Sequence, residues 1–449
     1  MKKIFQYIML AVVTIVMASC TSDIEETTAT TGKNNVQLVV GEFPAFGDSQ
    51  TRTIGTPDPG KTSWAVGDEL LLVIDNTSYG SHSATFTYNG KSWELTSGEL
   101  VYREGDPAYI PHVYYAPNYK WANTSLMLKK GKAAGTDEYI EGTAIITGNG
   151  ETITVSFAEA TRKYSRLRIA TLPNEQITVD TEDFTPAGSS DMEQKGNYTL
   201  TSDEKGNAYL YGTFENNSEV TVKYREAALT TYTFSQATES AKSYALDATV
   251  ISANSAEEIK SAIEQKVADG KTTIRLNLAP NAGTDEFMAI REAIKGAAPN
   301  DLGTIELTII GVETIPEEAF YKMLQLKSVR MSDVKEIKKY AFKECQYLTV
   351  VEAPSLNKLN SGAFNKCNLL SKLTFGPINY ADARYWPIFE DITPNIDLIL
   401  SDYQKEMIKT DDDLYTANND IDYALSNKHL NKNFLGREFK SITCRYRVE

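Results

Sequence analysis

Apolar residues return at a fixed step of 22 positions between residues 312 and 375. The pair Ala-Phe marks the step most clearly, at Ala319–Phe320, Ala341–Phe342 and Ala363–Phe364. A period of this length predicts stacked coils, because one coil is too small to bury its own apolar face. The other apolar columns in the same register are Ile315, Ile337 and Leu359; Met323, Cys345 and Cys367; Leu326, Leu348 and Leu370; and Val329, Val351 and Leu373.

Each coil is predicted to contain a short strand, at Leu326–Met331, Leu348–Ala353 and Leu370–Phe375. Side chains alternate between two faces along a strand, so one set points into the core and the other points out. The outward set, extended one coil back, is the candidate binding face. A solvated sheet face is the competing interpretation, because the charges are mixed and Val350 is the one large apolar member. The outward residues are Glu306, Thr308, Ser328, Arg330, Val350, Glu352, Lys372 and Thr374.

Segments on either side of the repeats have the pattern of end caps. Ser255-Ala-Glu-Glu258 is a capping box that opens a predicted helix, and Gly270 closes it. A second helix is predicted over Asp285–Lys295. Open stacks of coils need atypical ends of this kind to cover their apolar surfaces. Further strands are predicted at Thr273–Leu278, Thr304–Ile310 and Ile396–Leu400.

From residue 36 to 250 the pattern changes to short alternating runs separated by turn signals such as Tyr88-Asn-Gly90. Many short strands with this punctuation are typical of antiparallel sandwiches or barrels. The length fits two domains of about a hundred residues each. We therefore expect all-β sandwiches over 36–150 and 151–250, divided near Gly150, followed by an α/β repeat solenoid over 251–449.

The N-terminus has the pattern of a secretory signal. Lys2 and Lys3 precede an apolar run over Ile4–Met17, and Ala18-Ser19-Cys20 follows. The run is shorter than the roughly 20 residues that a spanning helix needs. Residues 1–19 are therefore predicted to be a signal peptide. Residues 20–35 are polar and rich in Thr, which predicts a flexible linker.

The segment around Phe342 resembles the BspA-type leucine-rich repeat of bacterial surface proteins. Met323 stands in the first coil where that family usually has Cys. The resemblance implies a leucine-rich-repeat fold and adhesion to host or bacterial surfaces. The matching residues are Ile337, Ala341, Phe342, Cys345, Leu348 and Val351.

The residues before Cys20 resemble the lipobox of bacterial lipoproteins, with Met17 in place of the usual Leu. The resemblance implies cleavage before Cys20 and acylation of its sulfur. The acidic residues Asp23, Glu25 and Glu26 resemble the signal that sends some lipoproteins to the outer leaflet, which implies anchorage in the outer membrane. An ordinary secretory signal with an incidental Cys is the alternative. Thr51-Arg-Thr53 and Trp64-x₂-Gly67-Asp68 resemble the N-terminal part of fimbrillin-like lipoproteins, which implies tandem sandwiches and possible pilus partners. Arg52 is a candidate processing site, and an exposed loop Arg is the competing interpretation.

The residues that would mark an enzyme are sparse. Three His are far apart in sequence, and no phosphate loop, His-Glu-x-x-His or Gly-x-Ser-x-Gly occurs. We therefore expect no catalysis, no cofactor and no metal; Asp411-Asp-Asp413 is read as a solvated acidic loop. A net charge of −15 disfavours nucleic acid as a partner. Tyr119 and Trp121 could stack on sugars, but sandwiches also fill their cores with such residues.

The sequence thus predicts a lipid-anchored surface protein whose repeat region binds a host or bacterial protein or glycan. Two alternatives remain. One is an anchor or accessory subunit of a pilus, and the other is a surface glycan-binding lipoprotein that serves nutrient uptake.

Overall fold

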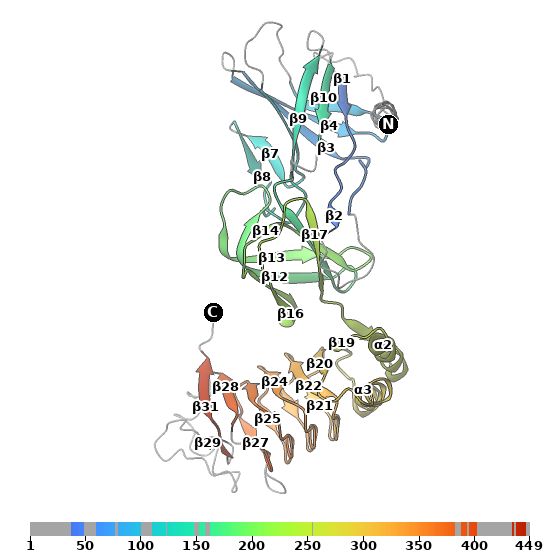
Figure 1. The fold of residues 1–449 in the computed structure, drawn as a ribbon, viewed down its shortest axis with the longest axis vertical. Helices are drawn as coiled ribbons and strands as arrows, with labels where there is room; N and C mark the ends of the chain where they lie inside the picture. Colours follow the sequence, from blue (N-terminus) through green and yellow to red (C-terminus); the bar gives the residue numbers. More distant parts are fainter. Residues whose placement is uncertain are drawn as a thin grey trace, which may run out of the picture. The chain divides into compact units, whose positions relative to one another are not determined.

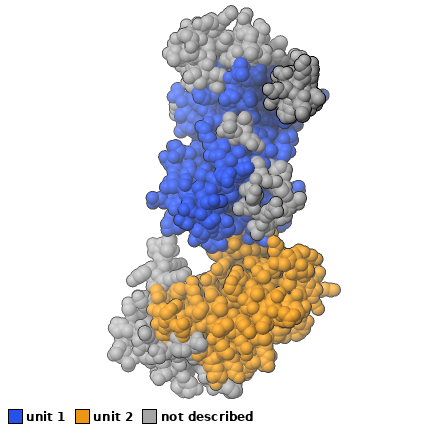
Figure 2. Space-filling model, viewed as in Figure 1, with its two compact units in different colours: residues 1–221, 231–247 blue, residues 222–230, 248–449 orange. Residues whose placement is uncertain are grey.

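The chain divides by its internal contacts into two units, which are described separately (Figures 1 and 2). The first unit contains residues 1–221 and 231–247, and the second contains 222–230 and 248–449. Strands dominate both units, and the described residues form two helices. The computed structural model describes residues 37–48, 60–76, 80–99, 110–122, 124–147, 152–157, 162–253, 255–381, 388–392, 395–401, 433–434 and 437–445.

The first unit begins with a seven-stranded sheet in the order β1-β10-β9-β6-β3-β4-β5. Alternation decides its two faces: Leu70, Leu72 and Ile74 are fully buried in a core that also holds Phe86 and Trp93. A separate hairpin consists of β7 (Tyr119–Ala122) and β8 (Ser125–Leu128). The strands of the sheet are β1 (Gln37–Val40), β3 (Glu69–Asn76), β4 (Gly80–Tyr88), β5 (Trp93–Gly98), β6 (Ile110–Tyr115), β9 (Ile140–Thr147) and β10 (Thr152–Ser156).

A second sheet, which belongs to this unit except for residues 222–230 of β15 and β16, runs in the order β16-β15-β12-β14-β11-β17-β2, with β13 paired to β12. Its core holds Phe184 and Phe214, whose ring centroids are 4.4 Å apart. The strands are β2 (Gly47–Asp48), β11 (Ser165–Ala170), β12 (Gln176–Pro186), β13 (Glu193–Thr201), β14 (Asn207–Phe214), β15 (Glu219–Tyr224), β16 (Ala227–Thr233) and β17 (Lys242–Asp247).

The division expected near Gly150 needs correction. Strand β10 follows that glycine, yet it pairs with β9 antiparallel and with β1 in parallel, so it belongs to the first sheet. The expected boundary therefore falls between two strands that pair with each other in one sheet. Glycine and asparagine mark a hairpin connection as readily as a domain boundary, which is why the sequence pattern misled. The tandem sandwich architecture itself stays a prediction.

The charged side chain of Arg162 is completely buried in the first unit. Its guanidinium donates to the Glu138 carboxylate at 2.6 Å and to the Pro44 carbonyl oxygen at 2.8 Å. The same guanidinium lies over the Phe46 ring, 3.8 Å from the centroid. Burying a charge is costly unless such partners offset the lost hydration. Arg162 therefore ties together three segments that are distant in sequence.

Replacing Glu138 by Ala leaves the Arg162 charge buried without its carboxylate partner. We expect the free energy of unfolding to fall by about 3–5 kcal/mol, measured by urea denaturation. The matched control is Glu182→Ala, because the Glu182–Lys195 pair of the same unit is largely exposed. That change should cost less than about 1 kcal/mol. Similar losses in the two variants would contradict the stabilising role of Arg162.

The second unit is organised by parallel strands that recur once per repeat (Figure 1). Its main sheet has the order β18-β19-β20-β22-β24-β26-β28-β31. The register is the one that the sequence period predicts, since Ser328 pairs with Val350 and Val350 with Lys372. The strands are β18 (Ile251–Ala253), β19 (Thr273–Leu278), β20 (Ile305–Ile310), β22 (Leu326–Met331), β24 (Val350–Ala353), β26 (Lys372–Phe375), β28 (Asp397–Ser401) and β31 (Ser441–Arg445).

A second, smaller parallel sheet of two-residue strands follows the same step. Its order is β21-β23-β25-β27. Its strands are β21 (Thr314–Ile315), β23 (Glu336–Ile337), β25 (Lys358–Leu359) and β27 (Tyr380–Ala381), and a short hairpin elsewhere consists of β29 (Asn433–Phe434) and β30 (Arg437–Glu438).

The two helices precede the repeats, as predicted. Helix α2 (Ala256–Ala268) begins after Ser255, whose hydroxyl accepts a hydrogen bond from the Glu258 backbone N–H at 3.3 Å. Gly270 follows it with φ +72°, a conformation that glycine adopts without strain. Helix α3 (Thr284–Ala297) buries Phe287, Ile290 and Ile294 against the repeat core. It therefore covers apolar surface at the first coils.

Phenylalanines of successive coils stack inside the second unit. The centroids of Phe320 and Phe342 are 5.1 Å apart, and those of Phe342 and Phe364 are 5.4 Å apart with rings inclined by 7°. All three side chains are fully buried. Phe287 of α3 meets the first ring edge-on at 5.7 Å, and Phe389 stacks on the last ring at 5.7 Å. The column thus runs through the repeats and into the segments that flank them.

Truncation of the central ring should destabilise the second unit. Phe342→Ala removes a side chain with an aromatic neighbour on each side, so we expect a loss of about 3–5 kcal/mol. The measurement is the unfolding transition of the second unit in the full chain. Leu369→Ala is the control, because Leu369 belongs to the same repeats but is 52% exposed. It should change stability by less than about 0.5 kcal/mol, and an unchanged transition for Phe342→Ala would contradict the stacking.

The repeat cysteines are structural thiols. The Cys345 thiol donates to the Phe320 carbonyl oxygen at 2.9 Å, and the Cys367 thiol donates to that of Phe342 at 3.0 Å. Both are fully buried and unbridged. Burial raises the pKa of Cys345 to about 12, so this thiol stays neutral and unreactive near pH 7. Each thiol thus forms a hydrogen bond to the preceding coil. Met323 occupies the same repeat position in the first coil and is buried in the core.

Candidate functional site

The outward residues of the repeat strands lie in two rows across the main sheet of the second unit. Strand pairing aligns Glu306, Ser328, Val350 and Lys372 in one row. It aligns Thr308, Arg330, Glu352 and Thr374 in the other. The alternate residues of the same strands, such as Val329 and Val351, are completely buried. The rows therefore form the solvent side of a sheet whose other side is the repeat core.

Two ion pairs cross from one strand to the next on or beside this face. The Arg330 guanidinium donates to the Glu352 carboxylate at 3.0 Å, and the Lys327 ammonium lies 2.8 Å from the Glu306 carboxylate. Side-chain exposures of 43% and 30% for Arg330 and Glu352 leave both in contact with water. Such exposed pairs contribute about 0–1 kcal/mol each. Their main effect is to hold opposite charges in register.

Two of the eight residues predicted to form the binding face are not available to a partner. Thr308 is 4% exposed and Thr374 is 8% exposed. Pairing places Thr308 between Arg275 and Arg330, and Thr374 between Glu352 and Ile399. Arg275, which pairs with Thr308, is itself 6% exposed and donates to the Leu229 carbonyl oxygen at 2.6 Å, so the outward side of the sheet is covered at this end of the row. The residues that keep partial exposure are Glu306, Ser328, Arg330, Val350, Glu352 and Lys372.

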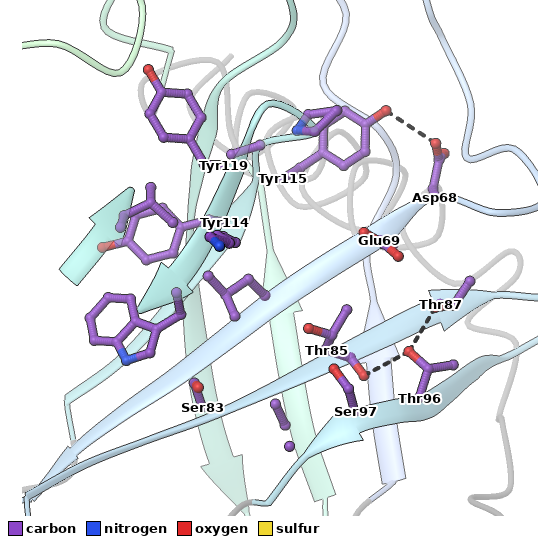
Figure 3. Close-up of a pocket in the computed structure, with 18 of the residues that line it drawn as sticks. Asp68, Glu69, Ser83, Thr85, Thr87, Thr96, Ser97, Tyr114, Tyr115 and Tyr119 are labelled. Carbon is purple, nitrogen blue, oxygen red and sulfur yellow. Dashed lines mark hydrogen bonds between the residues drawn. The ribbon is translucent and has the colours of Figure 1, made fainter. Parts of the chain in front are cut away.

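The first unit contains a cleft of about 820 Å³, over strands β3 to β8 (Figure 3). Its floor carries hydroxyl groups from β4 and β5. The Thr87 and Thr96 hydroxyls are 2.8 Å apart, and Thr96 also donates to the Thr85 carbonyl oxygen at 3.2 Å. Side chains alternate between the two faces of β4: Ala84 and Phe86 are buried in the core, so the residues between them face the cleft. The hydroxyl residues of the lining are Ser83, Thr85, Thr87, Thr96 and Ser97.

Aromatic residues form one wall of this cleft. Trp121 of β7 is partly exposed, and within the described part of the chain its indole N–H has no hydrogen-bond partner. Tyr119 of the same strand is largely buried, and its hydroxyl donates to the Ala187 carbonyl oxygen at 3.2 Å. Burial raises the pKa of Tyr119 to about 12. Of the two aromatic residues that the sequence suggested for sugar stacking, Trp121 alone is placed to meet a ligand.

Charged groups in and around the cleft are largely paired. The Lys61 ammonium bonds to the Asp68 carboxylate and donates to the Tyr115 hydroxyl. The Tyr115 hydroxyl in turn donates to Asp68 at 3.1 Å (Figure 3). Burial, and then the Asp68 charge, raise the pKa of Tyr115 well above its usual value. The Lys129 ammonium lies 3.6 Å from the Glu69 carboxylate. The cleft is consequently polar without a dominant charge.

Several predicted features lie outside the described residues. They are the signal segment 1–19, Cys20, the linker 20–35, Arg52 and the acidic segment Asp411-Asp-Asp413. Among the residues that are described, no three His, Cys, Asp or Glu side chains converge in a way that would hold a metal ion. No helix in that part of the chain is both long enough and apolar enough to span a membrane.

Comparison with known proteins identifies the repeats. Residues 302–385 match the family described as BspA type Leucine rich repeat region, in six copies. The chain therefore contains a BspA-type leucine-rich-repeat region. No curated protein matches the chain. A solved structure that matches is that of a "putative cell adhesion protein" from Bacteroides fragilis NCTC 9343, at 12% identity and a TM-score of 0.25, over 51% of this chain and 93% of that one.

Proposed function

We propose that this protein is a cell-surface adhesion or binding protein that recognises a protein or glycan partner through the outward face of its repeat strands. The alignment of six partly exposed side chains on neighbouring strands of one parallel sheet carries the proposal. Stacked repeats commonly use such extended surfaces for recognition. The match of residues 302–385 to BspA-type repeats supports the same role. Recognition is non-covalent, without turnover of the partner.

The composition of the face suits a protein partner in particular. Val350 lies in the row between Ser328 and Lys372, and the Arg330–Glu352 pair spans the same strands in the adjoining row. An apolar centre surrounded by charged groups is the usual composition of a protein interface. The ion pair holds Arg330 in one orientation before binding, which reduces the side-chain entropy lost on association.

The location that we propose is the outer membrane, with attachment through acyl chains on Cys20. The charged start, the apolar run and the small residues before Cys20 support this assignment. Two lipid chains make such attachment stable, since each buried CH₂ contributes about 0.8 kcal/mol. The polar residues after Cys20 would then separate the folded units from the membrane surface.

Removal of Arg330 should weaken binding through the repeat face. We expect Arg330→Ala to reduce adhesion of the purified chain to bacterial cells or to matrix-protein-coated wells by about tenfold. The measurement is the concentration of protein at half-maximal adhesion. Lys335→Ala is the matched control, because it breaks a similar exposed pair with Glu313 beside the smaller sheet. Equal adhesion of both variants and the unmodified chain would argue against the repeat face.

The lipid anchor has its own test. Cys20→Ala removes the sulfur that would be acylated, so we expect the chain to move from the membrane fraction to the soluble fraction of the producing cell. Phase separation in detergent measures the change. Cys444→Ala serves as the control, because it removes another thiol of the chain without touching the lipobox. A Cys20→Ala chain that still partitions with membranes would remove the lipoprotein assignment.

A further inference from the structure

We propose that the cleft over strands β3 to β8 of the first unit binds neutral carbohydrate. This site is independent of the repeat face, because all of its lining residues belong to the first unit. Its volume of about 820 Å³ is within the size range of small-molecule binding sites. The chemistry of the ligand follows from three features of the lining: one accessible indole ring, a floor of hydroxyl groups and charges of both signs that offset one another.

Trp121 supplies the surface on which a sugar ring can pack. A pyranose presents its C–H groups on one face, and these pack against an aromatic ring while the hydroxyls at the rim stay available for hydrogen bonds. Tryptophan suits this contact, because it combines a large apolar area with one N–H donor. Both are available here, since the Trp121 ring lines the cleft and its N–H has no partner within the described residues.

The floor of the same cleft matches the other requirement of a sugar. The hydroxyl groups of Ser83, Thr85 and Ser97 line the cleft and make no hydrogen bond within the described part of the chain. Each hydroxyl both donates and accepts, as sugar hydroxyls do. Neighbouring outward residues are roughly 7 Å apart along a strand and about 4.8 Å apart between strands, which gives the floor a regular array of partners.

The charges of the lining favour a neutral ligand over an ionic one. Asp68 is held by Lys61, Glu69 is paired with Lys129, and Lys120 adds a further positive charge to the lining, so both signs are present. Asp137 also lines the cleft, and burial raises the pKa of its carboxyl. An anionic ligand would meet these carboxylates, and a cationic one would have to compete with the lysines. A neutral polar ligand avoids both costs.

The wall that carries Trp121 is fixed before any ligand arrives. Asn118, at the start of the β7–β8 hairpin, is 3% exposed, and its side-chain amide donates to the Ala133 carbonyl oxygen at 3.1 Å and to the Thr136 hydroxyl at 2.9 Å. The Tyr119 hydroxyl is anchored on Ala187. Binding therefore orders little of the protein, and preorganisation of this kind strengthens affinity.

The test is affinity gel electrophoresis of the full chain in gels that contain soluble starch, yeast mannan or laminarin, with heparin as the anionic comparison. We expect at least one neutral polysaccharide to retard the protein and heparin to leave it unaffected. Trp121→Ala should weaken that retardation by at least about tenfold in apparent dissociation constant. Trp121→Phe, which keeps an aromatic ring but loses the N–H, should weaken it by an intermediate factor.

Two further variants separate a binding role of Trp121 from a structural one. Thr85→Val removes a floor hydroxyl at nearly constant shape and should also weaken retardation. Tyr380→Ala removes a partly exposed ring from the second unit and should leave retardation unchanged. The proposal is overturned if no neutral polysaccharide retards the chain, if heparin alone does, or if retardation survives both Trp121→Ala and Thr85→Val. Arg330→Ala should not alter retardation, so failure here is distinguishable from failure of the repeat-face proposal.

Discussion

The stacking of one phenylalanine per coil is the interaction on which the second unit depends. Phe320, Phe342 and Phe364 are fully buried, and each ring lies about one coil from the next, at centroid distances of 5.1 and 5.4 Å. A coil of 22 residues cannot bury such a ring alone, so each coil requires its neighbours. The same spacing fixes the register of the strands, and the register in turn aligns the outward residues in rows. The proposed binding face is therefore a geometric consequence of the core.

Much of the second unit is predictable from the sequence, because its contacts join residues one period apart. Strand β22 is found at the predicted residues, Leu326–Met331, and Ser255 caps α2 as the capping box indicates. Two exposures were mispredicted. Alternation places Thr308 and Thr374 outward, but both are buried, and burial depends on contacts made by other segments of the chain. The alternation of side chains along one strand does not predict which outward residues other segments will bury.

The first unit was less predictable, because its sheets pair strands that are distant in sequence. Strand β1 pairs with β10 across more than a hundred residues, and no local pattern specifies that choice. The cleft was unpredictable for the same reason, because its lining residues come from strands that are distant in sequence. Alternation along β4 predicts that the hydroxyls of Ser83, Thr85 and Thr87 point outward, but only the tertiary structure shows that they line the same cleft as Trp121. Trp121 and Tyr119 are two residues apart and seemed equivalent in the sequence, yet the bond to Ala187 commits Tyr119 to the core.

The two proposed surfaces also differ in the way that sequence change affects them. On the repeat face the outward side chains contribute little to stability, since exposed pairs such as Arg330–Glu352 are worth about 0–1 kcal/mol. Substitutions of these outward residues can therefore change the binding partner without altering the buried phenylalanine column. In the cleft, by contrast, the wall is tied to the fold through Asn118 and Tyr119. A change of ligand in the cleft is therefore expected to come from Ser83, Thr85, Ser97 and Trp121, whose side-chain polar groups make no hydrogen bond within the described part of the chain.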